Sequence, residues 1–263
     1  MAPFLDFTKP FKGIYMGILS DSEIKRFWKE GYLVFERLIP ETDLEHYMTV
    51  FNEMVQNANG LEDHTGAYFL ELDTYNRPIP QKLHKVQGVC VAEPRILAIA
   101  GQKEILDRVE EFTGPNIDVF GTKFFPKLPG GGTSTNWHQD NFYFGTNSSK
   151  IISCGIYLQD ADEENGCLQV IPGSHIEKRI LEHSPQSGRH GSWTRVDDTL
   201  RKTLPVPAGS VVIFSANLLH GAVDNTSSVL SRYSTAWHYI PGDLSLSRFP
   251  RGVFEDRHTV RGI

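Results

Sequence analysis

The sequence predicts a mainly β protein in which a jelly-roll core is covered by helices. From residue 116 onward, short runs of β-branched and aromatic residues alternate with clusters of Gly, Pro, Asn and Asp, as in a sandwich or barrel. Before that point, apolar residues recur at helical spacing, so helices come first and strands later. The 263 residues are enough for one large β domain with a real core.

The chain is expected to form a single domain over residues 1–263, because no repeat, low-complexity segment or linker divides it. We expect a helix-rich part over about 1–115, a jelly-roll core over about 116–245 and an insertion over about 176–204. The insertion is too long for an ordinary turn. A lid over a binding site and a solvated surface loop both fit it.

Residues typical of helix starts and ends predict the first two helices. Ser20 and Glu23 have the spacing of a capping box, which predicts a helix that ends near Gly31, followed by a short strand over 32–35. A second helix opens at Pro40-Glu41-Thr42. Its apolar stripe is formed by Leu44, Met48, Phe51 and Val55.

The next segment, between Gly60 and Pro80, is polar and irregular apart from residues 68–70. Residues 83–91 predict a strand, and residues 96–112 predict one helix that starts near Pro94 and ends near Gly114. The β-rich runs of the second half are 117–125, 151–158, 167–171, 211–214 and 231–240.

Composition excludes several classes of function. A net charge of −6 gives no general electrostatic reason to bind nucleic acid or acidic membranes, and no apolar run has the length of a membrane helix. Cys90, Cys154 and Cys167 are odd in number and form no C-x-x-C pair, which favours three unlinked thiols in a reducing compartment. We therefore expect a cytoplasmic protein, monomeric or homodimeric, whose partner is a small molecule.

The stretch His138-Gln139-Asp140 carries the strongest chemical signal. On an extended strand His138 and Asp140 point the same way, and together they make two-thirds of the 2-His-1-carboxylate triad that holds non-haem iron. The candidate for the missing histidine is His220, which follows the apolar strand 211–214. An H-x-D motif alone is weak evidence, and a near match, His175-Ile176-Glu177, follows a turn and is interpreted as peripheral.

An arginine downstream of His220 suggests the co-substrate. A 2-oxo acid can chelate two open iron positions and leave the last one for O₂. The far carboxylate of 2-oxoglutarate then requires a planar, permanently charged group, which Arg232 offers. Ser234 shares a strand face with Arg232, whereas Tyr233, Thr235 and Trp237 face the other way.

The sequence resembles the phytanoyl-CoA dioxygenase family of Fe(II)/2-oxoglutarate oxygenases over most of its length. The stretches that carry the resemblance are Gly31-Tyr32-Leu33-Val34, Lys85-Val86-Gln87, Phe112-Thr113-Gly114-Pro115-Asn116-Ile117, Trp137-His138-Gln139-Asp140, residues 165–175 (NGCLQVIPGSH) and Leu219-His220-Gly221. Taken together, these motifs are highly specific.

The resemblance implies a double-stranded β-helix, the jelly-roll or cupin-like core, with His138, Asp140 and His220 on iron. It also implies that Arg232 anchors 2-oxoglutarate and that Lys85 lies near this co-substrate. Fe(II), 2-oxoglutarate and O₂ are the implied cofactor and co-substrates, with ascorbate as a stimulant.

Two positions depart from the family pattern. The family often has serine two residues after the distal histidine, where this chain has Ala222, so one hydrogen bond to the co-substrate is in doubt. Lys123 stands where the animal acyl-CoA enzymes have an apolar residue. We hypothesise that Lys123 reaches toward a polar or anionic substrate, or toward 2-oxoglutarate itself.

The predicted activity is a dioxygenase that oxidises, by hydroxylation, an aliphatic C–H of a small molecule while 2-oxoglutarate becomes succinate and CO₂. The resemblance also covers halogenases, which lack the carboxylate ligand, so Asp140 favours hydroxylation; ring closure, desaturation and epoxidation stay open. The other possibilities are a cupin-type lyase or isomerase without 2-oxoglutarate, a non-catalytic sensor of iron or 2-oxoglutarate, and a plain interaction module. Candidates for contacting the substrate are Gln87, Phe142, Trp193 and Trp237, though each aromatic residue equally fits a core position.

Overall fold

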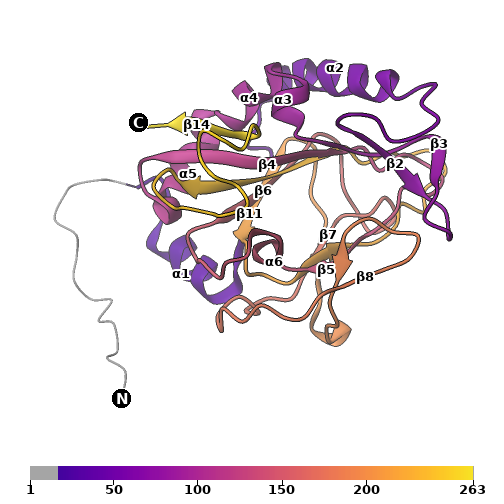
Figure 1. Ribbon diagram of the computed structural model, residues 1–263. Coiled ribbons are helices and arrows are strands. Elements are labelled where there is room, and N and C mark those ends of the chain that lie inside the picture. The colour runs from indigo at the N-terminus through magenta and orange to yellow at the C-terminus, as the bar shows by residue number, and fades with distance from the viewer. Residues whose placement is uncertain (1–16, 263) are drawn as a thin grey trace.

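The computed structural model describes residues 17–262 and has a jelly-roll core of two facing antiparallel sheets (Figure 1). The large sheet has the strand order β1 (Tyr32–Phe35), β11 (Ser210–Ser215), β6 (Ile152–Tyr157), β13 (Ser234–Pro241), β4 (Ile117–Phe125), β3 (Pro78–Gln87) and β2 (Tyr68–Leu72), with β14 (Arg257–Arg261) also paired to β4. The small sheet has the order β10 (Lys202–Leu204), β7 (Leu168–Val170), β12 (His220–Ala222) and β5 (Thr135–His138). The predicted fold class is confirmed.

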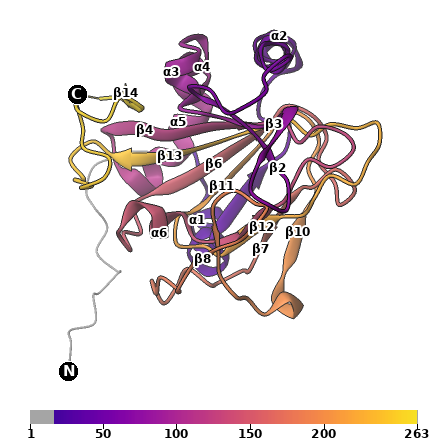
Figure 2. The ribbon, with the colours of Figure 1, turned by 45° about the vertical axis from the view of Figure 1, so that its right-hand side comes forward.

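Helices cover the face of the large sheet that points away from the small sheet. Figures 1 and 2 show α2 (Glu41–Asn57), α3 (Val89–Ala92) and α4 (Arg95–Ala100) above the large sheet, with the small sheet below it. The α5 helix (Lys103–Thr113) packs against β6 and β13. The space between the sheets is thus separated from the helical layer by the large sheet.

The predicted capping box begins α1 (Asp21–Glu30). The Ser20 N–H donates to the Glu23 carboxylate at 2.8 Å, and the Glu23 N–H donates to Ser20 Oγ at 3.3 Å. Gly31 ends the helix with a φ of 92°, a left-handed conformation that glycine adopts without strain. This turn leads directly into β1, as the sequence predicted.

The apolar stripe of α2 is rotated from the expected one. Its buried residues are Tyr47, Val50, Phe51 and Met54. Of the predicted stripe only Phe51 is fully buried, while Leu44, Met48 and Val55 pack at the edge of the same core. The helix therefore presents a broader face to the sheet than a single row of residues.

Two predicted elements were wrong in their bounds. The single helix over 96–112 is divided into α4 and α5, because Gly101 ends the first helix and Gln102 is extended, with ψ at 132°. The apolar spacing continues across this break since both helices pack on one core. The strand predicted over 83–91 is β3, which begins at Pro78 and ends at Gln87, where Gly88 turns the chain with a φ of 64° into the short α3.

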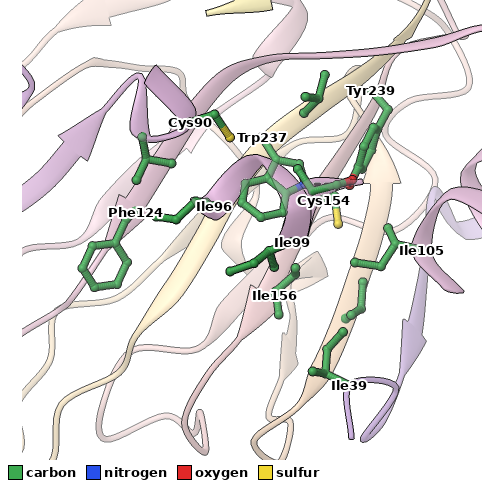
Figure 3. Packing of buried hydrophobic residues seen from close by; sticks show 14 of the residues in the cluster. Ile39, Cys90, Ile96, Ile99, Ile105, Phe124, Cys154, Ile156, Trp237 and Tyr239 are labelled. Atoms are coloured by element: carbon green, nitrogen blue, oxygen red, sulfur yellow. Dashed lines mark hydrogen bonds between the residues drawn. The ribbon is translucent and has the colours of Figure 1, made fainter. Parts of the chain in front are cut away.

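The main core lies between the helices and the large sheet. Figure 3 shows Trp237, Cys154 and Ile156 from the sheet among isoleucines of the helices. The Trp237 indole N–H donates to Tyr239 Oη at 3.0 Å, and the Tyr239 hydroxyl donates to the Ala100 carbonyl at 2.7 Å. The three cysteines are all free and buried, as predicted.

Candidate active site

A cavity of about 330 Å³ opens between the two sheets, and most predicted site residues line it. These residues are Lys85, Gln87, Lys123, His138, Asp140, His220, Arg232, Ser234 and Trp237. They come from β3, β4, β5, β12 and β13 and from the segments that adjoin these strands. The jelly roll therefore gathers predicted site residues that are up to 152 positions apart, from Lys85 to Trp237, in one place.

The predicted metal ligands form a compact cluster. His138, Asp140 and His220 each offer one ligand atom, and these atoms lie within 4.8 Å of one another. His138 and His220 are register partners on β5 and β12, with ring centroids 4.2 Å apart. Their Nε2 atoms lie 3.4 and 3.6 Å from the two oxygens of Asp140. Two imidazoles and one carboxylate in this arrangement fit the facial triad of non-haem iron.

Backbone carbonyls fix the orientation of both imidazoles. His138 Nδ1 lies 2.6 Å from the Asn136 carbonyl oxygen, and His220 Nδ1 lies 3.0 Å from the Leu218 carbonyl oxygen. A carbonyl only accepts, so each Nδ1 carries the proton and each Nε2 presents a lone pair toward Asp140. Burial lowers the pKa of His220 to about 4, so this imidazole is neutral at pH 7, the form that binds a metal.

Asp140 reaches the cluster by a route that differs from the prediction. The strand β5 ends at His138, and Asp140 is the first residue of the short helix α6 (Asp140–Phe144). Gln139 between them stays extended, with φ −120° and ψ 129°, so the alternation of side chains still holds across it. Burial alone would raise the pKa of the Asp140 carboxyl, but the histidines around it outweigh burial and hold this pKa well below its usual range.

Gln139 connects the metal-ligand motif to the insertion, a role that the sequence analysis missed. Its side-chain amide donates to the carbonyls of Arg179 at 2.9 Å and Asn217 at 2.8 Å, and its Oε1 accepts the N–H of Leu181 at 2.9 Å. The residue between two ligands thus faces away from the cavity and holds the backbone of the motif.

A chain of hydrogen bonds leads outward from Asp140. Ser153 donates its hydroxyl proton to Asp140 Oδ2 at 2.6 Å, and His238 Nδ1 lies 3.0 Å from Ser153 Oγ. His238 Nε2 lies 3.3 Å from the Lys123 ammonium. Burial lowers the pKa of His238 to about 3, so a neutral ring donates from Nδ1 and accepts at Nε2. Sequence reasoning missed Ser153 and His238, although a serine within an apolar strand was a signal for the first.

The Ser153→Ala variant is expected to bind Fe(II) about 10- to 100-fold more weakly, because Asp140 loses the group that orients its carboxylate. Anaerobic titration with Fe(II) measures the change. Ser210→Ala removes another buried serine of the large sheet, outside the cavity, and serves as the matched control. Equal iron affinity in the two variants would show that Ser153 has no positioning role.

Arg232 also lines the cavity and has no carboxylate partner among the described residues. It is 4% exposed, and its Nη1 donates to Ser234 Oγ. Its Nε is buried and has no hydrogen-bond partner within residues 17–262. The predicted strand 231–240 begins only at Ser234, so Arg232 precedes β13 and yet points into the same cavity. A buried guanidinium without a counter-ion is costly and fits a site that is completed by an anion.

Lys85 and Lys123 lie on neighbouring strands of the large sheet. Gln87 on β3 is the register partner of Lys123 on β4, and Lys85 is two residues from Gln87 on the same face. The Lys123 ammonium donates to the Gly121 carbonyl at 2.9 Å. The Lys85 ammonium has no hydrogen bond or ion pair within residues 17–262 and lies 5.0 Å from the centre of the Phe69 ring. Burial, aided by the charge of Lys123, lowers the pKa of Lys85 from its ordinary 10.5 to about 8.

The Lys85→Met variant of the protein without ligands is expected to be more stable by about 1–3 kcal/mol at pH 7, because it removes a buried unpaired charge. The folded state holds the Lys85 proton less tightly than the unfolded state. Charged Lys85 therefore lowers the free energy of unfolding of the wild type by its full amount below pH 8. This effect disappears as the pH rises from 8 to 10.5. Denaturant unfolding at pH 7 and at high pH measures this difference. Lys150→Met, at an exposed lysine, is the control, and an equal change in both variants would contradict the account.

Two predicted substrate contacts do not reach the cavity. Phe142 stacks on His183, with centroids 4.1 Å apart, and Trp193 is 40% exposed beside a second hollow of about 240 Å³. Neither residue is part of the main lining. Trp237 borders the cavity, but its indole packs in the hydrophobic core (Figure 3). Tyr143, which the sequence analysis named only as a possible wall residue, does line the cavity.

The insertion covers one side of the cavity through residues 190–192. Its strands β8 (Ser184–Pro185) and β9 (Ser192–Trp193) form a small hairpin. Arg189 bonds Asp224 at 2.7 Å and His190 lies 2.7 Å from the Leu70 carbonyl, so the insertion is tied to the sheets on both sides. At the end of the expected insertion, β10 (Lys202–Leu204) pairs with β7 in the small sheet.

Comparison with known proteins agrees with this geometry. Residues 27–234 match the family model of phytanoyl-CoA dioxygenase. The chain belongs to the phytanoyl-CoA dioxygenase family. The predicted resemblance is thereby confirmed, and the match includes all three triad residues and Arg232.

Curated relatives of different function share this family. A probable alpha-ketoglutarate-dependent hypophosphite dioxygenase of Stutzerimonas stutzeri is 23% identical over 216 residues, which are 80% of this chain and 74% of that protein. The human peroxisomal phytanoyl-CoA dioxygenase is 27% identical over 236 residues, or 84% of this chain and 68% of that one. The protein is accordingly a 2-oxoglutarate-dependent non-haem iron oxygenase.

Solved structures support the fold. EctD from S. alaskensis, with 2-oxoglutarate and 5-hydroxyectoine, has a TM-score of 0.71 at 18% identity, covering 97% of this chain and 89% of that one. The carbocyclase SnoK from nogalamycin biosynthesis has a TM-score of 0.64 at 21% identity, covering 87% of both chains. Within residues 17–262, no helix has the length and apolar character needed to cross a membrane.

Proposed function

We propose that this family member hydroxylates an aliphatic C–H bond of a small molecule. One oxygen atom of O₂ enters the new hydroxyl group and the other enters succinate, as 2-oxoglutarate loses CO₂. The observation that carries the proposal is the pairing, within one cavity, of a complete ligand triad with a buried guanidinium that lacks a counter-ion.

Each of these residues has a distinct task. His138, Asp140 and His220 would hold Fe(II), and Arg232 with Ser234 would bind the far carboxylate of 2-oxoglutarate through charge-assisted hydrogen bonds. Bound iron and 2-oxoglutarate together supply the oxidant. Ala222 lines the cavity without a hydroxyl group, so Ser234 is the hydroxyl that accompanies Arg232 here.

The surroundings limit what the oxidant can reach. Aromatic side chains wall the site: Phe214 lies 4.6 Å from the His220 ring and Tyr143 lies 5.8 Å from the His138 ring, centre to centre. The insertion closes one side through residues 190–192. We assign it the role of a lid that excludes water and side reactions while the substrate is bound.

The retained carboxylate favours hydroxylation over halogenation. Asp140 fills the position that a halide would need, and Ser153 holds its carboxylate in place. The cavity volume of about 330 Å³ is at the lower end of the usual range of about 300–1,000 Å³ for ligand pockets. Because 2-oxoglutarate must share this space, the substrate is expected to be small.

Succinate formation from 2-oxoglutarate, with Fe(II), O₂ and ascorbate and without added substrate, tests the proposal. Slow uncoupled turnover is expected for the wild type and for His46→Ala, which changes an exposed histidine, but not for His138→Ala. Absence of turnover in the wild type, together with no anaerobic binding of 2-oxoglutarate to the iron-loaded protein, would contradict the proposal and favour a lyase or isomerase.

A further inference from the structure

The cavity contains more positive charge than the metal and the co-substrate require. Its charged lining consists, among the described residues, of Lys85, Lys123, Arg232 and Asp140. In the proposed complex, the carboxylate of Asp140, a divalent metal, dianionic 2-oxoglutarate and Arg232 balance one another. The Lys85 ammonium then has no carboxylate near it, and Lys123 has only the carboxylate of buried Asp256, with which it forms no ion pair. Ammonium groups without a direct anionic partner are unfavourable in a site shielded from water.

We propose that Lys85 and Lys123 bind an oxyanion group of the substrate, a carboxylate or a phosphonate. This inference rests on the proposed function, and it names the class of molecule that is hydroxylated. Ammonium groups are compact charges that bind both kinds of oxyanion. The substrate is then a small aliphatic acid, whose charged end is held on β3 and β4 while its carbon chain points toward the metal.

The two strands place three donors on one patch. Lys123 and Gln87 face each other across the β3–β4 pair, and Lys85 lies on the same face of β3. All three side chains line the cavity. Two ammonium groups and an amide can together surround the oxygens of one carboxylate or phosphonate.

Within residues 17–262, no carboxylate is in direct contact with either ammonium group. Lys123 contacts the Gly121 carbonyl and the His238 ring, with buried Asp256 the nearest carboxylate besides Asp140 that acts on it, and Lys85 contacts the Phe69 ring. Among the described residues, neither forms an ion pair with a carboxylate. Buried Arg257, by contrast, donates to Asp118 at 2.9 Å. In the part of the chain that the structure describes, Lys85 and Lys123 thus lack the direct carboxylate contact that Arg257 has, and unlike Arg257 they line the cavity.

The site is close to the metal. Lys123 is joined to Asp140 through His238 and Ser153 by bonds of 3.3, 3.0 and 2.6 Å. An anion on Lys123 would therefore lie three hydrogen bonds from a metal ligand, in the same cavity as the metal site. The same hydrogen bonds fix the position of the ammonium relative to the metal, so a bound acid would present the same carbon to it in each turnover.

The co-substrate does not account for both lysines. Its 2-oxo acid end is bound by the metal, and its far carboxylate is matched by Arg232 and Ser234. A contact from Lys85 to 2-oxoglutarate, which the resemblance implies, would still leave Lys123 without an anion. The experiment must therefore measure co-substrate and substrate affinity separately.

The test compares Lys123→Met and Lys85→Met with Lys82→Met, a control on β3 whose ammonium donates to the Gly130 carbonyl outside the cavity. Calorimetry under anaerobic conditions measures binding of butanoate, propylphosphonate and neutral butanamide to the protein loaded with Fe(II) and 2-oxoglutarate. Consumption of 2-oxoglutarate in air is measured with the same compounds. Separate titrations give the dissociation constant of 2-oxoglutarate.

The wild type should bind one or both acids, but not butanamide, and the bound acid should accelerate 2-oxoglutarate consumption. The acid that binds more tightly shows whether the site prefers a carboxylate or a phosphonate. Lys123→Met should weaken acid binding at least tenfold and change 2-oxoglutarate affinity less than threefold, and Lys82→Met should change neither. A loss of 2-oxoglutarate affinity with unchanged acid binding would assign the lysines to the co-substrate and overturn the inference. Equal binding of butanamide, or no binding of either acid, would also overturn it.

The proposed function fails on a different result. If the wild type forms no succinate and does not bind 2-oxoglutarate, the proposed oxygenase activity is wrong. If succinate forms slowly without substrate and neither acid binds, the oxygenase stands and only the oxyanion site is rejected.

Discussion

The Asp140→Ala variant is expected to lose iron affinity and succinate formation, each by more than about 100-fold. Changes to groups that merely orient metal ligands cost about 10- to 100-fold in metal affinity or activity, and removal of a ligand costs more. Without the carboxylate, two imidazoles and no negative charge remain for a divalent cation. Anaerobic titration with Fe(II) measures affinity, and succinate analysis measures turnover.

The control for this variant is Asp243→Ala, which removes an exposed carboxylate outside the cavity. Circular dichroism establishes that both variants fold. In the Asp140→Ala protein, protons and Fe(II) should no longer compete for the carboxylate, so the part of the pH dependence of iron affinity that Asp140 causes should disappear. Iron affinity within threefold of the wild type would show that the metal lies elsewhere.

The Arg232→Met variant should bind Fe(II) normally and 2-oxoglutarate poorly. Removing one partner of a buried charge pair costs about 2–5 kcal/mol, which raises the dissociation constant of 2-oxoglutarate roughly 30-fold or more. Arg232→Lys keeps the charge but not the planar group of donors, so it should recover only part of the affinity.

A change in the ligand tests the same contact between Arg232 and the far carboxylate of 2-oxoglutarate. The compound 2-oxopentanoate keeps the chelating end of 2-oxoglutarate and lacks the far carboxylate. Wild-type protein should prefer 2-oxoglutarate strongly, and Arg232→Met should bind the two compounds within about threefold of each other. If the variant keeps the full preference, another residue binds the far carboxylate.

The chemistry of the centre was predictable because it depends on few residues with strong local signals. The alternation of side chains placed His138 and Asp140 on one side, and this held even though the strand ends between them, since Gln139 remains extended. His220 was found because it follows a buried strand and precedes Arg232. The fold then required only that these segments be neighbours, which the jelly roll provides.

The aromatic residues show where the sequence was insufficient. Alternation already placed Trp237 on the face opposite Arg232, and the structure confirms that its indole lies in the core. Phe142 and Trp193 belong to a short helix and to a hairpin of the insertion, whose orientations depend on tertiary contacts. Aromatic residues fill cores and pockets equally well, so residue type alone could not separate the two cases.

The groups around the ligands were missed for a related reason. Ser153 and His238 are neighbours because the strand register pairs them across β6 and β13. The register of β13 with β4 shifts between Ala236 and His238. No local pattern predicts such a pairing, because it depends on which strands the fold brings together. The division of α4 from α5 at Gly101 was likewise hidden by an apolar spacing that continued through it.

The most direct test of the central claim is the fate of oxygen atoms. Wild-type protein is incubated with Fe(II), 2-oxoglutarate and ¹⁸O₂ and the succinate is analysed by mass spectrometry. The account predicts succinate that carries one ¹⁸O atom, since decarboxylation takes one oxygen atom from O₂. Succinate without the label, or none above the level of Asp140→Ala, would contradict the assignment of this cavity as an Fe(II)/2-oxoglutarate oxygenase site.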